Sequence, residues 1–104
     1  MTQVLVQNMA GLEEKAEDVA SLLSVMGNSK RLIVLCNLLE REYSVGELAE
    51  MVKLSDAALS QHLSKLRMLG LVKTRRDGQT IYYRLGSDKV RRVLSTLHDL
   101  YCVP

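Results

Sequence analysis

Apolar side chains recur along most of the chain at the spacing of an α-helix. In the middle of the chain, Leu59, Leu63 and Leu66 stand at i, i+4 and i+7, which predicts a helix over residues 56–68. Ser55 precedes this helix and is expected to cap it, because its hydroxyl can accept a hydrogen bond from an N–H group of the first turn. The opposite face is small and polar, so this helix can approach a groove closely.

Four more helices follow from the same periodicity. Residues 30–39 are apolar on most sides, which predicts the central helix of the core. Ser44 and Glu47 have the spacing of a capping box at the start of residues 45–52. The predicted helices other than 56–68 are 12–26, 30–39, 45–52 and 88–102.

The helical spacing gives way to strand-like alternation after Gly70. Residues 71–76 and 80–85 are rich in Val, Thr, Ile and Tyr, and the turn residues 77–79 between them predict a β-hairpin. Two short helices joined by a tight turn form a helix-turn-helix, and a hairpin directly after it is the wing of a winged helix-turn-helix. The predicted order is α-α-α-α-β-β-α, a mainly α fold with a small β-hairpin.

The first and last helices carry more apolar surface than a small domain can bury. The chain has 104 residues, enough for one domain, and a core of this size leaves stability marginal. We therefore expect a homodimer through the first and last helices, which would present two recognition helices to a pseudo-palindromic site in double-stranded DNA. Residues 1–11 are predicted to be a flexible N-terminal arm, and residues 12–104 the DNA-binding and dimerisation domain.

Basic side chains are concentrated in the second half of the chain. Residues 1–52 hold four basic and eight acidic side chains, whereas residues 53–92 hold ten basic and three acidic ones. A basic excess that coincides with a polar helix and a hairpin is typical of a nucleic-acid-binding face. The side chains predicted to contact operator DNA are Ser55, Ala57, Ser60, Gln61, His62, Ser64, Lys65, Arg75, Arg76, Gln79 and Thr80.

Several classes of function are disfavoured by what the sequence lacks. It has no apolar run as long as a membrane span and no leader-like N-terminus, so we expect a cytoplasmic protein without a membrane partner. It has no Cys-x-x-Cys motif, no catalytic Cys/His pattern and no phosphate-binding glycine loop, which argues against an enzyme and against a bound cofactor. Two cysteines in a cytosolic protein do not by themselves predict a structural disulfide.

Four segments resemble the ArsR/SmtB family of bacterial winged-helix repressors. The resemblance covers residues 19–102 and is carried by residues 26–32 (MGNSKRL), 44–49 (SVGELA), 59–67 (LSQHLSKLR) and 71–83 (LVKTRRDGQTIYY). It implies a homodimeric regulator that represses by occupying an operator and that responds to a metal ion or a thiol-reactive signal. Asp56 stands where the family often has a neutral polar residue, so the operator sequence does not carry over.

The family's metal sites do not match this sequence. The site in the helix before the recognition helix needs Cys-x-Cys after Glu-Leu, but residues 49–51 contain no cysteine. The site in the last helix needs Asp-x-His, but Asp88 is followed by Val90 at the histidine position. A later histidine position of this site falls on Tyr101, so His98 is out of register. We therefore expect no metal site, and metal sensing is the alternative hypothesis.

Cys36 and Cys102 match a subgroup of the family that has one cysteine in the second helix and one at the end of the last helix. This match implies sensing of persulfides, other reactive sulfur species or oxidants through a direct or polysulfide bridge between the thiols. Such a bridge would pin the last helix to the core and lower operator affinity. The residues alone leave the role open, because Cys36 is in register with Leu32 and Leu39 and a buried cysteine is often just a small hydrophobic residue.

A third interpretation is a winged-helix module that binds protein and has no DNA-binding or sensor function. The basic residues of the predicted hairpin disfavour it, because a protein-binding surface needs no such excess.

Overall fold

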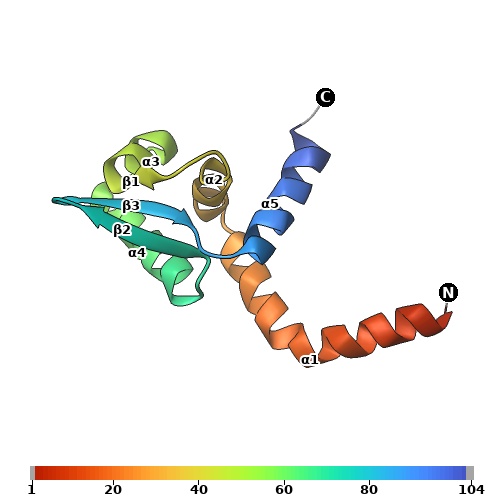
Figure 1. Ribbon diagram of the computed structural model, residues 1–104. Coiled ribbons are helices and arrows are strands. Elements are labelled where there is room, and N and C mark those ends of the chain that lie inside the picture. Colours follow the sequence, from red (N-terminus) through yellow and green to blue (C-terminus); the bar gives the residue numbers. More distant parts are fainter. Residues whose placement is uncertain (1, 103–104) are drawn as a thin grey trace.

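The computed structural model describes residues 2–102 and the side chains of residues 11–102. Its helices and a three-stranded sheet follow the chain in an order that places the hairpin between the last two helices (Figure 1). The elements are α1 (Thr2–Met26), α2 (Ser29–Asn37), β1 (Tyr43–Ser44), α3 (Val45–Val52), α4 (Asp56–Met68), β2 (Val72–Asp77), β3 (Thr80–Leu85) and α5 (Asp88–Tyr101).

Three of the predicted helices begin with a serine cap, two of them at the expected Ser44 and Ser55. The Ser55 hydroxyl accepts from the Ala58 N–H at 3.2 Å, and α4 has the predicted bounds. Ser44 and Glu47 exchange both bonds of the capping box at the start of α3. Ser87 caps α5 by accepting from the Val90 N–H at 3.2 Å. These caps are satisfied within a few residues of sequence, which explains why the pattern alone located them.

The first two helices differ from the prediction at their ends. The helix α1 begins at Thr2 rather than at Leu12, so Gly11 lies inside it. A single glycine costs a helix only about 1 kcal/mol, which does not suffice to end it. Figure 1 shows the first part of α1 extending away from the body of the molecule. The helix α2 ends at Asn37, and a turn takes residues 38–40.

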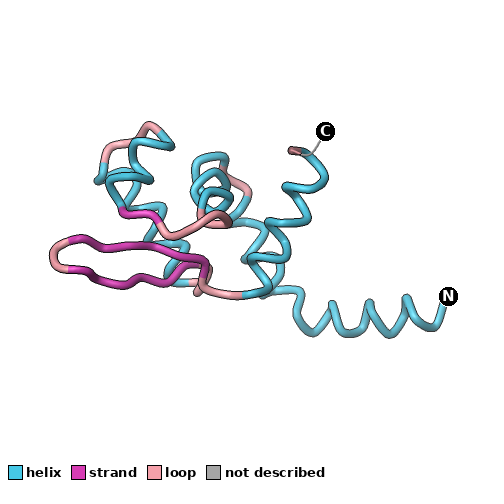
Figure 2. Tube along the Cα trace, turned by 45° about the horizontal axis from the view of Figure 1, so that its top comes forward, coloured by secondary structure: helices cyan, strands magenta, loops and turns pink. Residues whose placement is uncertain are grey.

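The strand β1 was not predicted. It pairs with β3 at the edge of the hairpin, in the order β1-β3-β2, with Tyr43 opposite Tyr83. Two residues are too few to show alternation, and their partner lies far along the chain. The hairpin itself has the predicted register, with Val72 opposite Leu85 and Asp77 opposite Thr80. Figure 2 shows its tip at the opposite end of the molecule from α1 and α5.

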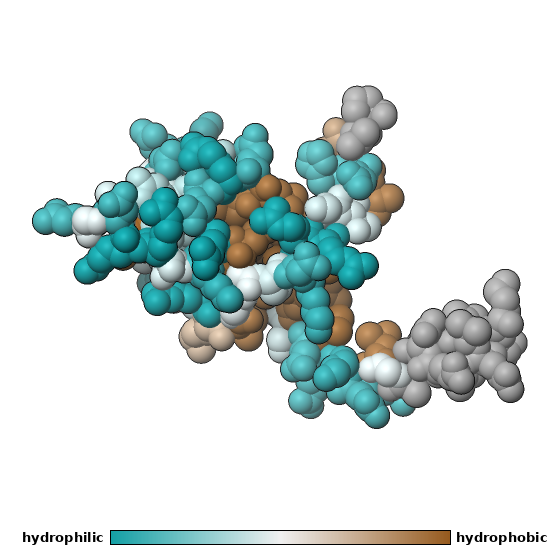
Figure 3. All heavy atoms as spheres, in the orientation of Figure 1, coloured by the Kyte–Doolittle hydropathy of each residue, from teal (hydrophilic) through white to brown (hydrophobic). Residues whose placement is uncertain are grey.

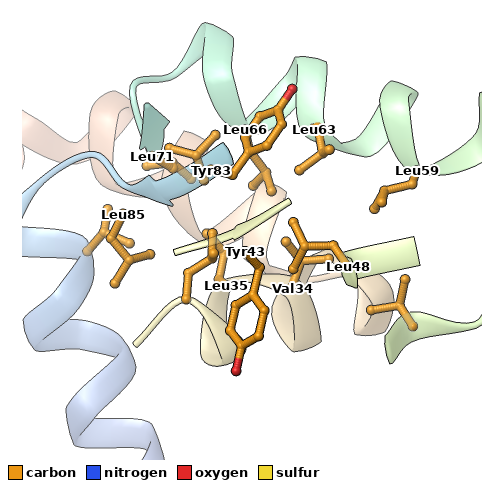
Figure 4. Close-up of a cluster of buried hydrophobic side chains, with 14 of the residues drawn as sticks. Val34, Leu35, Tyr43, Leu48, Leu59, Leu63, Leu66, Leu71, Tyr83 and Leu85 are labelled. Carbon is orange, nitrogen blue, oxygen red and sulfur yellow. The ribbon is translucent and has the colours of Figure 1, made fainter. Parts of the chain in front are cut away.

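The core is a mainly aliphatic cluster between α2, α3, α4 and the sheet, with Tyr43 and Tyr83 from the sheet among its buried residues (Figure 4). Val34 and Leu35 of α2 are fully buried, which confirms α2 as the central helix. Its other side is less covered than predicted, because Ile33 is 43% exposed. The three leucines of the α4 stripe are buried and point into this cluster from above α2 in Figure 4.

A tight approach between two glycines joins the hairpin to α5. A Cβ on Gly86 would lie 2.3 Å from the carbonyl oxygen of Gly70, so a side chain does not fit there. Gly70 itself has a φ of 73°, the left-handed conformation expected of a residue that follows a helix. These glycines let the end of α4 and the start of α5 pass close to one another.

The outer helices leave large apolar side chains in contact with solvent. On α1, Leu23 is 58% exposed, and on α5, Leu100 and Tyr101 are 70% and 83% exposed. In the described part of the chain, no single helix is both long and apolar enough to cross a membrane; α1 from Gly11 and α2 reach that length and composition only as a pair bent by 95°.

Candidate nucleic-acid interface and cysteine site

The helix α4 presents one polar face to solvent while its other face is buried. Leu59, Leu63 and Leu66 hold it against the core with at most 1% of their surface exposed. The predicted contact residues on the outer face are exposed, and they are Ser55, Ala57, Ser60, Gln61, Ser64 and Lys65. Asp56 is exposed beside the capping serine. A rigidly seated helix with small polar side chains outward has the shape needed to enter a major groove.

The wing carries its basic side chains on both faces. Arg75 is in register with Tyr82, and Arg76 with Ile81, so the two arginines point to opposite sides of the hairpin. Arg75 Nε lies 2.6 Å from Glu42 Oε1, and its guanidinium stacks 4.4 Å from the Tyr82 ring centroid. Its hydrogen bond to Glu42 raises the pKa of Arg75. At the tip, Gln79 and Thr80 are exposed, as is Arg76.

His62 is the one predicted contact residue that is half-buried. Its Nδ1 lies 3.4 Å from Nη1 of Arg31, a residue of α2. The Arg31 Nε in turn donates to the carbonyl oxygen of Val25, near the end of α1, at 2.7 Å. Burial, followed by the charges of Arg31 and Lys65, lowers the pKa of His62 below its ordinary value. His62 therefore faces the rest of the protein at least as much as it faces solvent.

The turn of the helix-turn-helix is held by a second basic residue of α2. Lys30 Nζ donates to the carbonyl oxygen of Val52 at 2.7 Å. The next residue, Lys53, has a φ of 58°, which is uncommon for a residue with a side chain. Sequence reasoning missed Lys30, Arg31 and Glu42 as residues that position the site. The available signal was two consecutive bases in the first turn of a helix, where the helix dipole disfavours positive charge.

The two cysteines line one hollow between α2 and α5. This hollow has a volume of about 490 Å³, and its walls are Leu32, Ile33, Cys36, Asn37, Glu40, His98 and Cys102. Figure 3 shows hydrophobic side chains gathered between the body and α5. The fold therefore brings together two thiols that are far apart in the sequence.

The environments of the two thiols differ. Both cysteines are free; Cys36 is half-buried, whereas Cys102 is exposed at the end of α5. Burial, and then the charge of Cys102, raise the pKa of the Cys36 thiol. His98 lies one turn before Cys102, and the backbone N–H of Cys102 donates to the His98 carbonyl at 2.8 Å. The thiolate is the reactive form of cysteine, and the raised pKa of Cys36 makes its thiolate less abundant. Cys102 is exposed and is therefore the more accessible nucleophile.

An adjoining hollow brings charged groups next to Cys36. It has a volume of about 300 Å³ and shares Cys36, Glu40 and His98 with the first hollow. Arg91, Glu40 and Asp99 lie in its walls. Within residues 11–102, no group of three or more His, Cys, Asp or Glu side chains is arranged to hold a metal ion. The chemistry that this region offers is that of two thiols beside a histidine.

Comparison with known proteins decides the family. The sequence pattern described as "Bacterial regulatory protein, arsR family" matches residues 28–74. The nodulation protein NolR of Rhizobium meliloti is 56% identical over 88 residues, which are 85% of this chain and 72% of NolR. The chain belongs to the ArsR family. It is therefore a DNA-binding regulator of transcription with a winged helix-turn-helix fold, and residues 28–74 of the family match span α2, α3 and α4.

Solved structures of other ArsR-family members agree with this fold. The structure of reduced HlyU from Vibrio cholerae superimposes with a TM-score of 0.85 at 46% identity, covering 89% of this chain and 98% of HlyU. The transcriptional repressor BigR from Xylella fastidiosa gives a TM-score of 0.84 at 36% identity, covering 92% and 98%. HlyU of Vibrio cholerae is described as a transcriptional activator. ArsR-family proteins this similar thus include both an activator and a repressor.

Proposed function

We propose that this ArsR-family protein is a homodimeric, thiol-switched regulator of the repressor type, which leaves its operator when Cys36 and Cys102 become bridged. The observation that carries the proposal is the hollow between α2 and α5 that both cysteines line. The inducer is a reactive sulfur species such as a persulfide, or an oxidant. In the cytoplasm, where thiols are kept reduced, the free pair is the resting state.

The helix α4 contacts the DNA bases, and the wing contacts the DNA backbone. The exposed polar side chains of α4 reach base edges and phosphates in the major groove. The Gln61 amide can both donate to and accept from one adenine, which gives a bidentate contact. The wing residues Arg75, Arg76, Gln79 and Thr80 contact the backbone beside the groove. Phosphate contacts from arginine make the binding strongly dependent on salt.

Two copies of the chain associate through α1 and α5. Leu23, Leu100 and Tyr101 are large apolar residues that one copy leaves exposed on these two helices. Burying them between copies related by a two-fold axis removes them from water and sets the spacing of the two α4 helices on a pseudo-palindromic operator. A change in the position of α5 then changes that spacing.

Bridging proceeds in two balanced steps when the inducer is a persulfide, RS–SH. The Cys102 thiolate attacks the outer sulfur, which forms Cys102–S–SH and releases the thiol RSH. The Cys36 thiolate then attacks the sulfur bonded to Cys102 carbon, which forms the Cys36–Cys102 disulfide and releases hydrogen sulfide. The order follows from exposure, since Cys102 is open to solvent and Cys36 is half-buried with a raised pKa. The product ties α5 to α2.

The test measures the covalent product and operator binding in the same sample. We expect mass spectrometry of persulfide-treated protein to show a crosslink between Cys36 and Cys102 within one chain, and the affinity for its operator to fall at least tenfold. The Cys36→Ser and Cys102→Ser variants should bind the operator as tightly as the reduced wild type and fail to respond. Equal affinity in the reduced and treated states would remove thiol sensing. A response of the double serine variant to zinc or copper would favour a metal sensor instead.

A further inference from the structure

Arg31 occupies a junction between three helices. It belongs to the first turn of α2, its Nε donates to the Val25 carbonyl of α1 at 2.7 Å, and its Nη1 lies 3.4 Å from His62 Nδ1 on α4. Arginine has five N–H donors and no acceptor, so in this contact the imidazole Nδ1 must be the acceptor. His62 is thus held as the neutral ring with its proton on Nε2. One guanidinium connects the end of the proposed dimerisation helix to the DNA-reading helix.

We propose that His62 is a positioning residue for DNA reading and does not itself contact DNA. Through its contact with Arg31, it fixes the position of α4 against α2. This inference rests on the proposed reading role of the exposed α4 face. The half-buried state of His62 supports it, because its neighbour Gln61 is exposed while His62 points back toward α2. Lys30, the residue before Arg31, binds the Val52 carbonyl at the end of α3, so α2 holds both helices of the helix-turn-helix.

Protonation of His62 breaks this link. An imidazolium has no acceptor at Nδ1 and places a positive charge 3.4 Å from the guanidinium. Burial lowers the pKa of His62, and the positive charges of Arg31 from α2 and Lys65 from its own helix lower it further. No charged group of α3 or β2, which also pack on α4, is among the causes of that shift. Because the pKa of His62 is lowered, the contact is still intact at a pH of about 6.5, the ordinary pKa of histidine, and is lost only as the pH falls through the lower pKa of His62.

Acid distinguishes a positioning role from a contact role because the two predict opposite effects. If His62 contacted a phosphate, its protonation would strengthen operator binding as the pH falls. If His62 positions α4, protonation displaces the helix and operator binding weakens. Loss of one hydrogen bond to a charged group corresponds to an affinity change of about tenfold.

The experiment combines NMR of the full-length protein with binding to a DNA duplex that the protein itself selects from a random pool at pH 7.5. We expect the ring nitrogens of His62 to report the Nε2–H tautomer, and Arg31→Gln to raise the pKa of His62. Operator affinity of the wild type should fall about tenfold as His62 is protonated, with the folded fraction followed at each pH. The Nδ1–H tautomer, an unchanged pKa in Arg31→Gln, or tighter binding in acid would overturn the proposal.

Matched variants complete the test. In His62→Asn the amide oxygen replaces the Nδ1 acceptor without titrating, so this variant should bind as the wild type does at pH 7.5 and stay constant as the pH falls. His62→Leu should bind weakly at every pH. His98→Asn removes the other histidine and should keep the wild-type pH profile; a flat profile there would assign the effect to α5 and overturn the role of His62. If Gln61→Ala left affinity unchanged while the NMR results held, the proposed α4 reading face would fail and the link would stand.

Discussion

The helix-turn-helix and wing differ from the outer helices α1 and α5 in how much of their apolar surface is buried within one chain. The leucines of α4 are almost fully buried against α2 and α3, and the caps of α3 and α4 are satisfied locally. On the outer helices, Leu23 and Leu100 remain more than half exposed. A single chain therefore buries the apolar face of the helix-turn-helix but leaves exposed the apolar surface through which two copies are proposed to associate.

The same division applies to chemistry. The exposed face of α4 carries one amide, two hydroxyls and a lysine, which hydrogen-bond but do not react, whereas both thiols lie at the junction of α2 with the outer helix α5. Under the proposed function, recognition and control can thus change independently, because a modification at Cys102 need not touch a side chain proposed to contact DNA. Arg31 is one place where the two regions meet, since it contacts α1 and α4 at once.

The largest expected effect is on the free energy of unfolding, which a core substitution in α4 should lower far more than a substitution on the exposed face of α5. Leu63→Ala removes a side chain that is 1% exposed, and we expect it to lower the free energy of unfolding by about 2–5 kcal/mol. Leu100→Ala should change the unfolding of the dilute monomer by less than about 0.5 kcal/mol, because its side chain is 70% exposed there. Chemical denaturation measures both. The Leu100→Ala variant should instead weaken self-association in analytical ultracentrifugation, and unchanged association would contradict the proposed α5 interface.

A smaller effect tests the reading face directly. Gln61→Ala should weaken binding to the selected operator by about 1–3 kcal/mol and relax the preference at one base pair, because a bidentate amide contact is lost. Met68→Ala is the matched control, since Met68 is 85% exposed on the same helix but outside the predicted contact set. Fluorescence anisotropy with single-base operator variants measures the change. A uniform loss over all operator variants would indicate that Gln61 contacts the backbone only.

The smallest effect compares the caps of the two regions. Ser44→Ala and Ser87→Ala each remove the hydroxyl that caps a helix, and each should lower the free energy of unfolding by about 1 kcal/mol. In Ser44→Ala the Glu47 carboxylate can still accept from the backbone N–H of residue 44, so only the bond to the Ser44 hydroxyl is lost. Thermal denaturation followed by circular dichroism measures both. A Ser87→Ala variant that lost several times as much would place part of the fold's stability at the start of α5.

Much of the site could be predicted because its determinants are local. The periodic leucines, the serine caps and the hairpin turn each act over a few residues, so α3, α4 and the wing were found with nearly correct ends, and the exposed face of α4 was identified with them. His62 was grouped with the exposed residues because helical spacing cannot show which side of a polar face is half-covered by another helix. That depends on Arg31, which is far from it in sequence.

The sequence by itself determined the helices, the hairpin, the basic second half and the presence of two thiols, since these depend on residue type and short-range spacing. Only the tertiary structure decided that β1 joins the sheet, that Gly86 packs on Gly70, that Cys36 and Cys102 line one hollow, and that Arg31 connects α1 to α4. These features arise between segments that are distant along the chain. Their partners are selected by how the buried faces of the helices pack, and a one-dimensional pattern does not contain that information.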